Sequence, residues 1–184
     1  MTTITPLAIP EVLLITPKRH GDARGWFAET WSEKLMAQAG LANPFVQDNQ
    51  AFNAKRGTLR GLHFQKAPHA QGKLVRVLKG AILDVAVDIR PGSATYGTWV
   101  GAALTATGGE QLFVPRGFAH GYCTTEPDTE LFYKVDGQYA PELEGGLAWN
   151  DPDLAITWPL EAEPVLSDKD RKLPRLKDLG PVAF

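Results

Sequence analysis

Three residues of this chain carry side chains suited to moving protons on a carbon skeleton: His63, Lys73 and Tyr133. A histidine can accept a carbon-bound proton near neutral pH, and a lysine cation can stabilise the negative charge that then develops on oxygen. A tyrosine can donate a proton from the opposite side of a ring. Together these types would invert a stereocentre next to a ketone. They would also serve plain recognition of an anionic ligand, so both interpretations stay open.

Each of these residues also has a purely structural interpretation. A lysine that opens an apolar run, as Lys73 does, is more commonly a solvated strand end, and Tyr133 is about as well explained as a core aromatic with a satisfied hydroxyl. In a regular strand, Arg60 and His63 would point to opposite faces. Gly61 lies between them, and a bulge at this glycine would bring both side chains to one cavity.

A metal site is the other chemistry that the histidines suggest. Pro115, Gly117 and His120 form a pattern that resembles the second motif of cupins, in which a turn carries a histidine into the mouth of a barrel. Metal-binding cupins have a His-x-His pair and a glutamate in their first motif, but here Gln65 stands where the second histidine would be. His63 and His120 fall short of an ordinary ligand set, so we expect no metal and keep packed core histidines as the structural alternative.

Short strands are the elements that would position these residues. The predicted strands are apolar runs bounded by Gly, Pro or Asp. They are Val12–Ile15, Trp26–Thr30, Leu74–Leu78, Ile82–Ile89, Thr98–Leu104, Gln111–Val114 and Leu131–Val135. One helix is expected over Ser32–Ala39, capped by Ser32 and followed by Gly40, and a polar turn is expected over His20–Gly25.

The run Ile82–Ile89 alternates apolar residues with Asp84, Ala86 and Asp88, which is typical of a half-buried strand whose second face tolerates charge. The chain from Pro141 onward is rich in proline, and we expect it to be irregular with short helices. Many short strands with closely spaced turns predict a sandwich or barrel.

Composition narrows the class of protein. A length of 184 residues fits one domain, 1–184, and a net charge of −2 leaves no basic surface for a nucleic acid polymer. Cys123 is the one cysteine, which excludes an internal disulfide. No apolar run approaches the ~20 residues that span a bilayer, and the N-terminal residues do not form a signal peptide pattern. We therefore expect a cytoplasmic protein without a membrane partner.

Nine motifs in order along the chain resemble one family, the dTDP-4-dehydrorhamnose 3,5-epimerases. They are Asp22-Ala-Arg-Gly25, Phe45-Val-Gln-Asp-Asn49, Leu59-Arg-Gly-Leu-His-Phe-Gln65, Gln71-Gly-Lys-Leu-Val-Arg76, Asp84-Val-Ala-Val-Asp-Ile-Arg90, Val114-Pro-Arg-Gly-Phe-Ala-His-Gly121, Leu131-Phe-Tyr-Lys-Val135, Glu144-Gly-Gly-Leu-Ala-Trp-Asn-Asp151 and Leu166-Ser-Asp-Lys-Asp170. The resemblance implies an all-β, cupin-like jelly roll (a double-stranded β-helix) with a few short peripheral helices.

The same resemblance implies a homodimer in which sheet from one chain completes the other, and it implies neither a metal nor another cofactor. The expected substrate is a dTDP-linked 4-keto-6-deoxy sugar, dTDP-4-dehydro-6-deoxy-D-glucose. Inversion at C3 and C5, which both flank the C4 ketone, would give dTDP-4-dehydro-L-rhamnose.

Carried over to this sequence, His63 is the base that removes the ring proton, and Asp170 is the carboxylate that orients it. Lys73 is the enolate stabiliser, and Tyr133 is the acid that reprotonates the other face. Further positions match contacts to the sugar, the diphosphate or the thymine. They are Arg24, Glu29, Gln47, Asp48, Asn49, Arg60, His120, Tyr139, Glu144 and Lys169, of which Tyr139 matches the aromatic that stacks on thymine.

Two alternatives remain beside the double epimerase. One is a relative that inverts a single carbon or moves the ketone, as in antibiotic-sugar pathways. The other is a cupin-like module that binds nucleotide-sugars without turnover. The presence of both His63 and Tyr133 favours double epimerisation over the first alternative, and the complete set of acid and base groups argues against the second.

Overall fold

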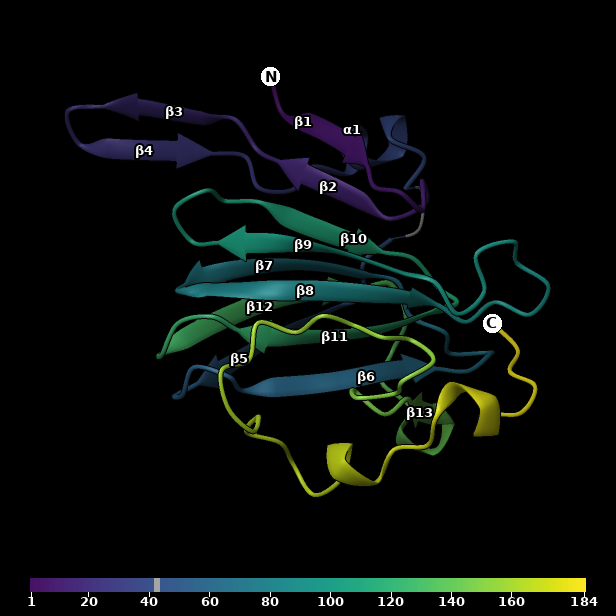
Figure 1. Ribbon diagram of the computed structural model, residues 1–184. Coiled ribbons are helices and arrows are strands. Elements are labelled where there is room, and N and C mark those ends of the chain that lie inside the picture. The colour runs from purple at the N-terminus through teal and green to yellow at the C-terminus, as the bar shows by residue number, and fades with distance from the viewer. Residues whose placement is uncertain (42–43) are drawn as a thin grey trace.

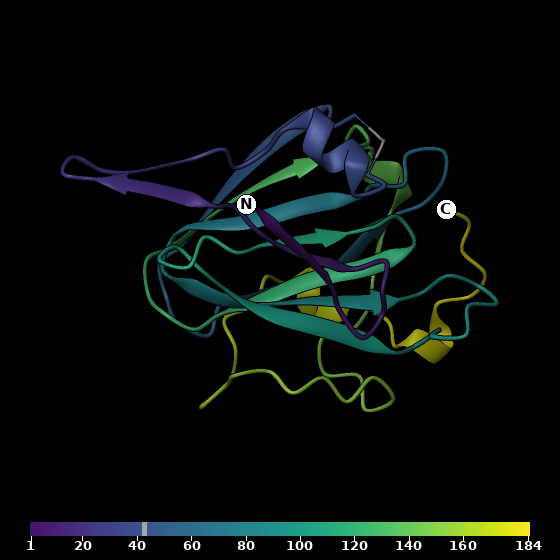
Figure 2. The ribbon, with the colours of Figure 1, turned by 90° about the horizontal axis from the view of Figure 1, so that it is seen from above.

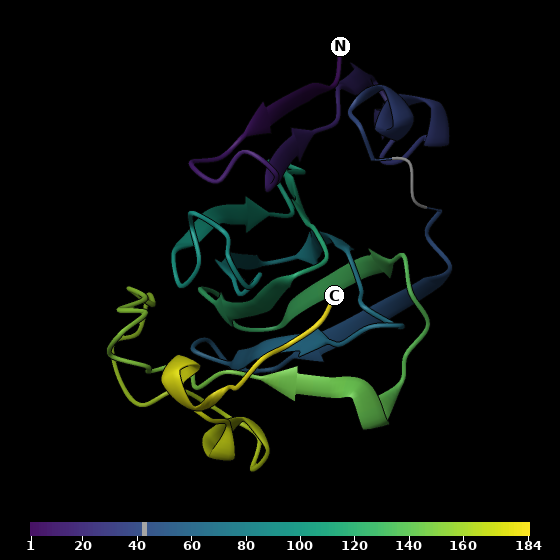
Figure 3. The ribbon, with the colours of Figure 1, turned by 90° about the vertical axis from the view of Figure 1, so that its right-hand side faces the viewer.

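The computed structural model describes residues 1–41 and 44–184, and two antiparallel sheets that face each other form its body (Figures 1 and 3). The first sheet has the order β1 (Thr3–Pro6), β2 (Leu13–Thr16), β10 (Gln111–Val114), β7 (Lys73–Lys79), β12 (Thr129–Val135) and β5 (Gln47–Asn53). The second has the order β13 (Glu144–Gly146), β6 (Leu59–Gln65), β11 (Phe118–Thr124), β8 (Ala81–Asp88) and β9 (Trp99–Thr105).

The main core lies between the two sheets. In both sheets, successive side chains of a strand point to opposite faces, so every second side chain points toward the space between the sheets. Among the buried residues of this core are Val75, Val77, Ile82, Val100, Leu104, Leu112, Phe118 and Leu131. The predicted all-β, cupin-like jelly roll is confirmed.

The C-terminal third of the chain covers the outer face of the second sheet (Figure 1). It is irregular, as expected, and holds three short 3₁₀ helices, η1 (Pro141–Leu143), η2 (Asp170–Lys172) and η3 (Leu176–Asp178). Leu147 and Trp158 from this segment pack against Val85 and Val87 of β8. The prediction that Ile82–Ile89 is half buried is therefore wrong, because both faces of β8 are covered.

A two-stranded hairpin, β3 (Arg19–Asp22) and β4 (Gly25–Ala28), extends away from the body as an arm (Figures 1 and 2). The polar turn predicted over His20–Gly25 is shorter than expected, because most of its residues belong to these strands.

Helix α1 (Glu33–Gln38) follows the arm, and its buried Met36 belongs to the same apolar cluster as Phe113 on the first sheet. Ser32 occupies the predicted N-cap position, but its side chain makes no capping hydrogen bond. Gly40, expected just past the end of the helix, has φ +80°.

One irregularity of the second sheet decides which way the side chains of β6 point. The pairing of β6 with β11 joins His63 to His120 and Arg60 to Tyr122, so β6 has one extra residue between the two pairs. This confirms the bulge expected near Gly61. A side chain at Gly61 would meet the Gly121 Cα at 2.6 Å and the backbone is at φ +119°, so only glycine fits here.

Within the described residues, no helix is long and apolar enough to cross a membrane.

Candidate active site

Seven of the predicted site residues line one cavity of about 290 Å³ between the two sheets. They come from both sheets and from the loop after β12, and they are Gln47, Asn49, His63, Lys73, Tyr133, Tyr139 and Glu144. Cavities at the mouth of a β-barrel are common ligand sites. The fold therefore gathers residues that are up to about a hundred positions apart in sequence.

His63 is paired with a buried carboxylate. Its Nε2 lies 2.6 Å from Oδ1 of Asp170, which stands at the start of η2 and is only 4% exposed. The hydroxyl of Ser167 accepts the backbone N–H of Asp170 and so fixes this helical turn. Burial acts to raise the pKa of Asp170, but the hydrogen bond and charge of His63, together with hydrogen bonds from Ser167 and Gly61, outweigh it and the pKa lies below its usual value.

The Asp170 carboxylate settles which ring nitrogen of His63 is basic. An ionised carboxylate only accepts hydrogen bonds, so Nε2 of His63 carries a hydrogen and donates a hydrogen bond to Asp170. Nδ1 is then the unprotonated nitrogen, able to take a proton. This is the geometry by which a carboxylate orients a histidine base and stabilises its charged form.

Lys73 opens β7 and its side chain reaches into the cavity rather than into bulk solvent. Burial lowers the pKa of Lys73 to about 8, while the charges of Asp84 and Glu144 act in the opposite direction. The ammonium is therefore the main form at neutral pH. A cation in such a partly dry site is well suited to stabilise a developing oxyanion.

Tyr133 lies on the inward face of β12, where it pairs with Val75 of β7 and Asn49 of β5. Burial raises the pKa of its phenol, and the nearby charge of Arg60 acts against this rise. The phenol is therefore protonated at neutral pH and can donate. Arg60 itself is held by the side chain of Asn53, which accepts its Nε–H at 2.9 Å.

His120 and Asp84 form a second histidine–carboxylate pair deep in the barrel. Nε2 of His120 lies 2.7 Å from Oδ1 of Asp84, and the two residues are 7% and 0% exposed. Burial lowers the pKa of His120. Within residues 1–41 and 44–184, Oδ2 of Asp84 has no hydrogen-bond partner. The alternation of Ile82–Ile89 placed Asp84 on one face with Ala86, but its pairing with His120 was not expected.

Tyr139 and Glu144 form the mouth of the cavity. Tyr139 is 55% exposed, and its hydroxyl donates to Oε2 of Glu144 at 3.2 Å. Nζ of Lys169 lies 2.6 Å from the same oxygen. Burial acts to raise the pKa of Glu144, but the hydrogen bond and charge of Lys169, together with the charge of His63 and the hydrogen bond from Tyr139, hold it below its usual value.

Six of the predicted binding residues are not among those that line this cavity within one chain, namely Arg24, Glu29, Asp48, Arg60, His120 and Lys169. Asp48 lies on the outer face of β5 and pairs with Lys134 at 2.8 Å. Arg24 pairs with Asp22 at the tip of the arm, and Glu29 is exposed just after β4.

Three further residues line the cavity and were not predicted as site residues, namely Phe64, Gln65 and Gln71. From the sequence, Gln65 was noted only as the residue that stands where metal-binding cupins have a second histidine. Its position two residues after His63 was the available signal, because alternate residues of a strand share a face.

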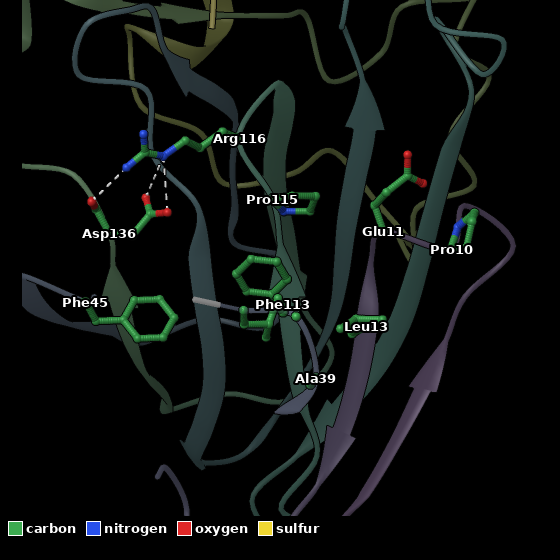
Figure 4. A pocket seen from close by; sticks show the side chains of 11 residues that line it. Pro10, Glu11, Leu13, Ala39, Phe45, Phe113, Pro115, Arg116 and Asp136 are labelled. Atoms are coloured by element: carbon green, nitrogen blue, oxygen red, sulfur yellow. Dashed lines mark hydrogen bonds and ion pairs between the residues drawn. The ribbon is translucent and has the colours of Figure 1, made fainter. Parts of the chain in front are cut away.

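A second cavity, of about 460 Å³, lies on the outer side of the first sheet beside α1 (Figure 4). Its walls are mainly apolar, with Phe45 and Phe113 facing each other across it, and an ion pair between Arg116 and Asp136 stands at one side. None of the predicted site residues lines it.

Within the described parts of the chain, no group of three or more His, Cys, Asp or Glu side chains is arranged to hold a metal ion. His63 and His120 each pair with a separate carboxylate.

Comparisons with known proteins identify the family of this chain. The family model described as dTDP-4-dehydrorhamnose 3,5-epimerase matches residues 6–178. A dTDP-4-dehydrorhamnose 3,5-epimerase of Sinorhizobium fredii is 51% identical and aligns over 97% of this chain and 91% of its own. The crystal structure of the enzyme of that name from Bacillus anthracis, with TDP and PPi bound, has a TM-score of 0.92 at 46% identity and covers 95% of this chain and 99% of its own.

A further structure is similar over a comparable length. The dTDP-6-deoxy-D-glucose-3,5-epimerase of Legionella pneumophila, in complex with dTDP-4-keto-L-rhamnose, has a TM-score of 0.93 at 42% identity and covers 97% of this chain and 95% of its own. With a family model over most of the residues and such relatives over nearly the whole length, this chain belongs to the dTDP-4-dehydrorhamnose 3,5-epimerase family.

Proposed function

We propose that this chain inverts C3 and C5 of dTDP-4-dehydro-6-deoxy-D-glucose and so forms dTDP-4-dehydro-L-rhamnose, in dTDP-L-rhamnose biosynthesis. One observation carries the proposal: His63, oriented by Asp170, lines the same cavity as Lys73 and Tyr133. The L. pneumophila relative binds dTDP-4-keto-L-rhamnose, which supports a dTDP-linked keto sugar as the ligand here.

His63 and Lys73 perform the first half of each inversion. The C4 ketone acidifies the protons on both neighbouring carbons, and Nδ1 of His63 takes one of them. The electron pair of the broken C–H bond moves to the ketone oxygen and gives an enolate. The positive charge of the Lys73 ammonium stabilises that oxygen. With a pKa of about 8, Lys73 carries this charge at neutral pH.

Tyr133 performs the second half. Its phenol donates a proton to the carbon from the face opposite to His63, and the enolate collapses back to the ketone with inverted configuration. Solvent then reprotonates the phenolate, and His63 releases its proton to solvent. The cycle repeats at the other carbon with no net change in the protein.

The nucleotide end of the ligand would occupy the mouth of the cavity. Tyr139, more than half exposed there, offers a ring for stacking on thymine. Gln47 and Asn49 offer amides, Arg60 and Lys169 offer cations for the diphosphate, and Glu144 connects Tyr139 to Lys169. His120 would contact the sugar from deeper in the barrel.

We further propose that residues 1–184 act as one domain in a cytoplasmic homodimer. The outer face of the first sheet exposes Phe52, and the arm exposes Trp26 and Phe27, which are 59% and 72% exposed. Large exposed apolar patches of this kind mark interaction surfaces. A second copy against this face would cover them, and the arms would carry Arg24 and Glu29 to the partner's cavity.

Proton exchange tests the proposal directly. The protein, treated with a chelator, is incubated with dTDP-4-dehydro-6-deoxy-D-glucose in deuterated water, and C3 and C5 are followed by NMR. Deuterium at both carbons with inverted configuration is the expected result. Exchange at one carbon alone would assign the chain to a single-site epimerase. Binding without exchange would leave a nucleotide-sugar-binding module and would overturn the catalytic roles.

A further inference from the structure

The segment Gly137–Ala140 carries Tyr139 to the mouth of the catalytic cavity, yet it lies outside every strand. Side-chain amides, rather than a neighbouring strand, hold much of its backbone. Nε2 of Gln71 donates to the carbonyl of Gly137 at 2.7 Å, and Oε1 of Gln47 accepts the N–H of Tyr139 at 3.3 Å.

Gln65 makes the largest contribution to this arrangement. Its Nε2 donates to the carbonyl of Gln138 at 3.1 Å, and its Oε1 accepts the N–H of Ala140 at 2.8 Å. The two bonds bracket Tyr139 on both sides. The same Nε2 donates to the carbonyl of His69 at 2.6 Å, which ties the segment to the loop before β7.

Only a carboxamide side chain can make this set of bonds. It needs two N–H donors and one acceptor at the end of one side chain, which a glutamate or a methionine lacks. Gln65 is 4% exposed, so water does not replace these bonds when they are lost. Tyr139, in contrast, is 55% exposed, so apart from the hydrogen bond of its hydroxyl to Glu144 the position of its ring depends on where its backbone is held.

We propose that Gln65 is a positioning residue that sets the affinity for the nucleotide by fixing the Tyr139 backbone at the mouth of the cavity. The inference rests on the proposed function of Tyr139 as the residue that contacts the base. A ring held in place before binding loses less conformational freedom on binding, and this raises affinity without a new contact. Proton transfer at the sugar ring does not involve Gln65.

The test is a double-mutant cycle between Gln65→Met and Tyr139→Ala, read by calorimetric titration with dTDP and by steady-state kinetics. Gln65→Met should weaken dTDP binding and raise KM by about tenfold, with kcat changed less than about threefold. In the Tyr139→Ala background the same change should have almost no further effect on Kd, since Gln65 acts through Tyr139.

Thr124→Val is the matched control for loss of buried side-chain hydrogen bonds. Thr124 is fully buried, lies near the other end of β6, and bonds the backbone of Lys55 and Thr58. It should lower Tm and leave Kd for dTDP unchanged. If Gln65→Met does not fold, Gln71→Met removes the single bond to Gly137 and should shift Kd in the same direction by less.

Two outcomes would overturn the inference: independent, additive losses of affinity from Gln65→Met and Tyr139→Ala, or a fall in kcat as large as the rise in KM. Unchanged dTDP affinity in Tyr139→Ala alone is a different result. It would reject the proposed contact between Tyr139 and the base, and with it the premise of this inference.

Discussion

His63 and His120 lie directly opposite each other where β6 pairs with β11, and each bonds through Nε2 to a different buried carboxylate. Two neighbouring imidazoles do not both hold a proton readily, because the charges repel. Burial lowers the pKa of His120; the charge and hydrogen bond of Asp84 act against this, and the charges of Lys73 and His63 add to it. The neutral form of His120 is therefore favoured, and in the proposed mechanism His63 is the imidazole that accepts and releases the substrate proton.

His63→Ala should abolish turnover, and Asp170→Asn should lower kcat by about 100-fold or more, because the base is lost in one variant and unsupported in the other. The measurement is the rate of deuterium entry at C3 and C5. Asp168→Asn is the matched control, since this carboxylate is exposed two residues before Asp170. Near wild-type turnover of His63→Ala would show that another group is the base.

Tyr133→Phe should spare proton removal more than product formation. The ring keeps its shape in the cavity and loses only the donor, so His63 still makes the enolate and solvent exchange continues. Product formation should fall by about 100-fold. Comparing the two rates in deuterated water checks this. Equal losses of exchange and product would contradict the role of Tyr133 as the acid.

The pH dependence of kcat/KM should follow the titration of Lys73. Because burial lowers its pKa to about 8, the ammonium is present below that pH and is lost as the pH rises through it. We therefore expect kcat/KM to fall above pH about 8. Asp84→Asn removes a charge that raises the pKa of Lys73, so this fall should begin at a lower pH.

Glu161→Gln is the control for the pH experiment. Its carboxylate pairs with Arg56 on the surface, away from the residues that line the cavity, and its removal should leave the profile unchanged. An alkaline limb that stays in place in Asp84→Asn would mean that Lys73 is not the group that titrates, or that Asp84 does not support its charge.

The predictable part of the fold is the part with ordinary core strands. The predicted bounds of Gln111–Val114 are those of β10, and the predictions Leu74–Leu78 and Thr98–Leu104 differ from β7 and β9 by one residue at each end. These predictions rested on apolar runs bounded by Gly, Pro or Asp, and such runs occur where most of a strand is buried.

β5 and β11 were not among the predicted strands, although β7 and β12, which carry Lys73 and Tyr133 to the cavity, were. β5 reads Gln-Asp-Asn-Gln-Ala-Phe-Asn, because its inward face lines a polar cavity and offers no apolar alternation. β11 is buried along its whole length, and His120 lies within this strand rather than in a turn beyond one. The candidate catalytic set was predicted from residue types and family motifs, whereas the contacts of Asp84 and Gln65 follow only from the register of the sheets and the side-chain hydrogen bonds.

The arm provides the last prediction. If the chain is a homodimer, light scattering should give twice the mass of one chain. If Arg24 serves the partner's cavity, Arg24→Ala and His63→Ala place their defects in different subunits of a mixed dimer. One cavity of each mixed dimer then has an intact His63 from its own chain and an intact Arg24 from its partner.

Mixing equal amounts of the two inactive variants, with dissociation and reassembly, should therefore restore about a quarter of wild-type activity, because half of the dimers are mixed and each has one complete cavity of two. The control is a mixture in which both variants carry His63→Ala, which should stay inactive. If Arg24 acted in its own chain's cavity, every cavity of the mixed dimer would hold a defect and no activity would return. Arg24 is exposed and pairs with Asp22 beside it on the arm, which favours the first outcome.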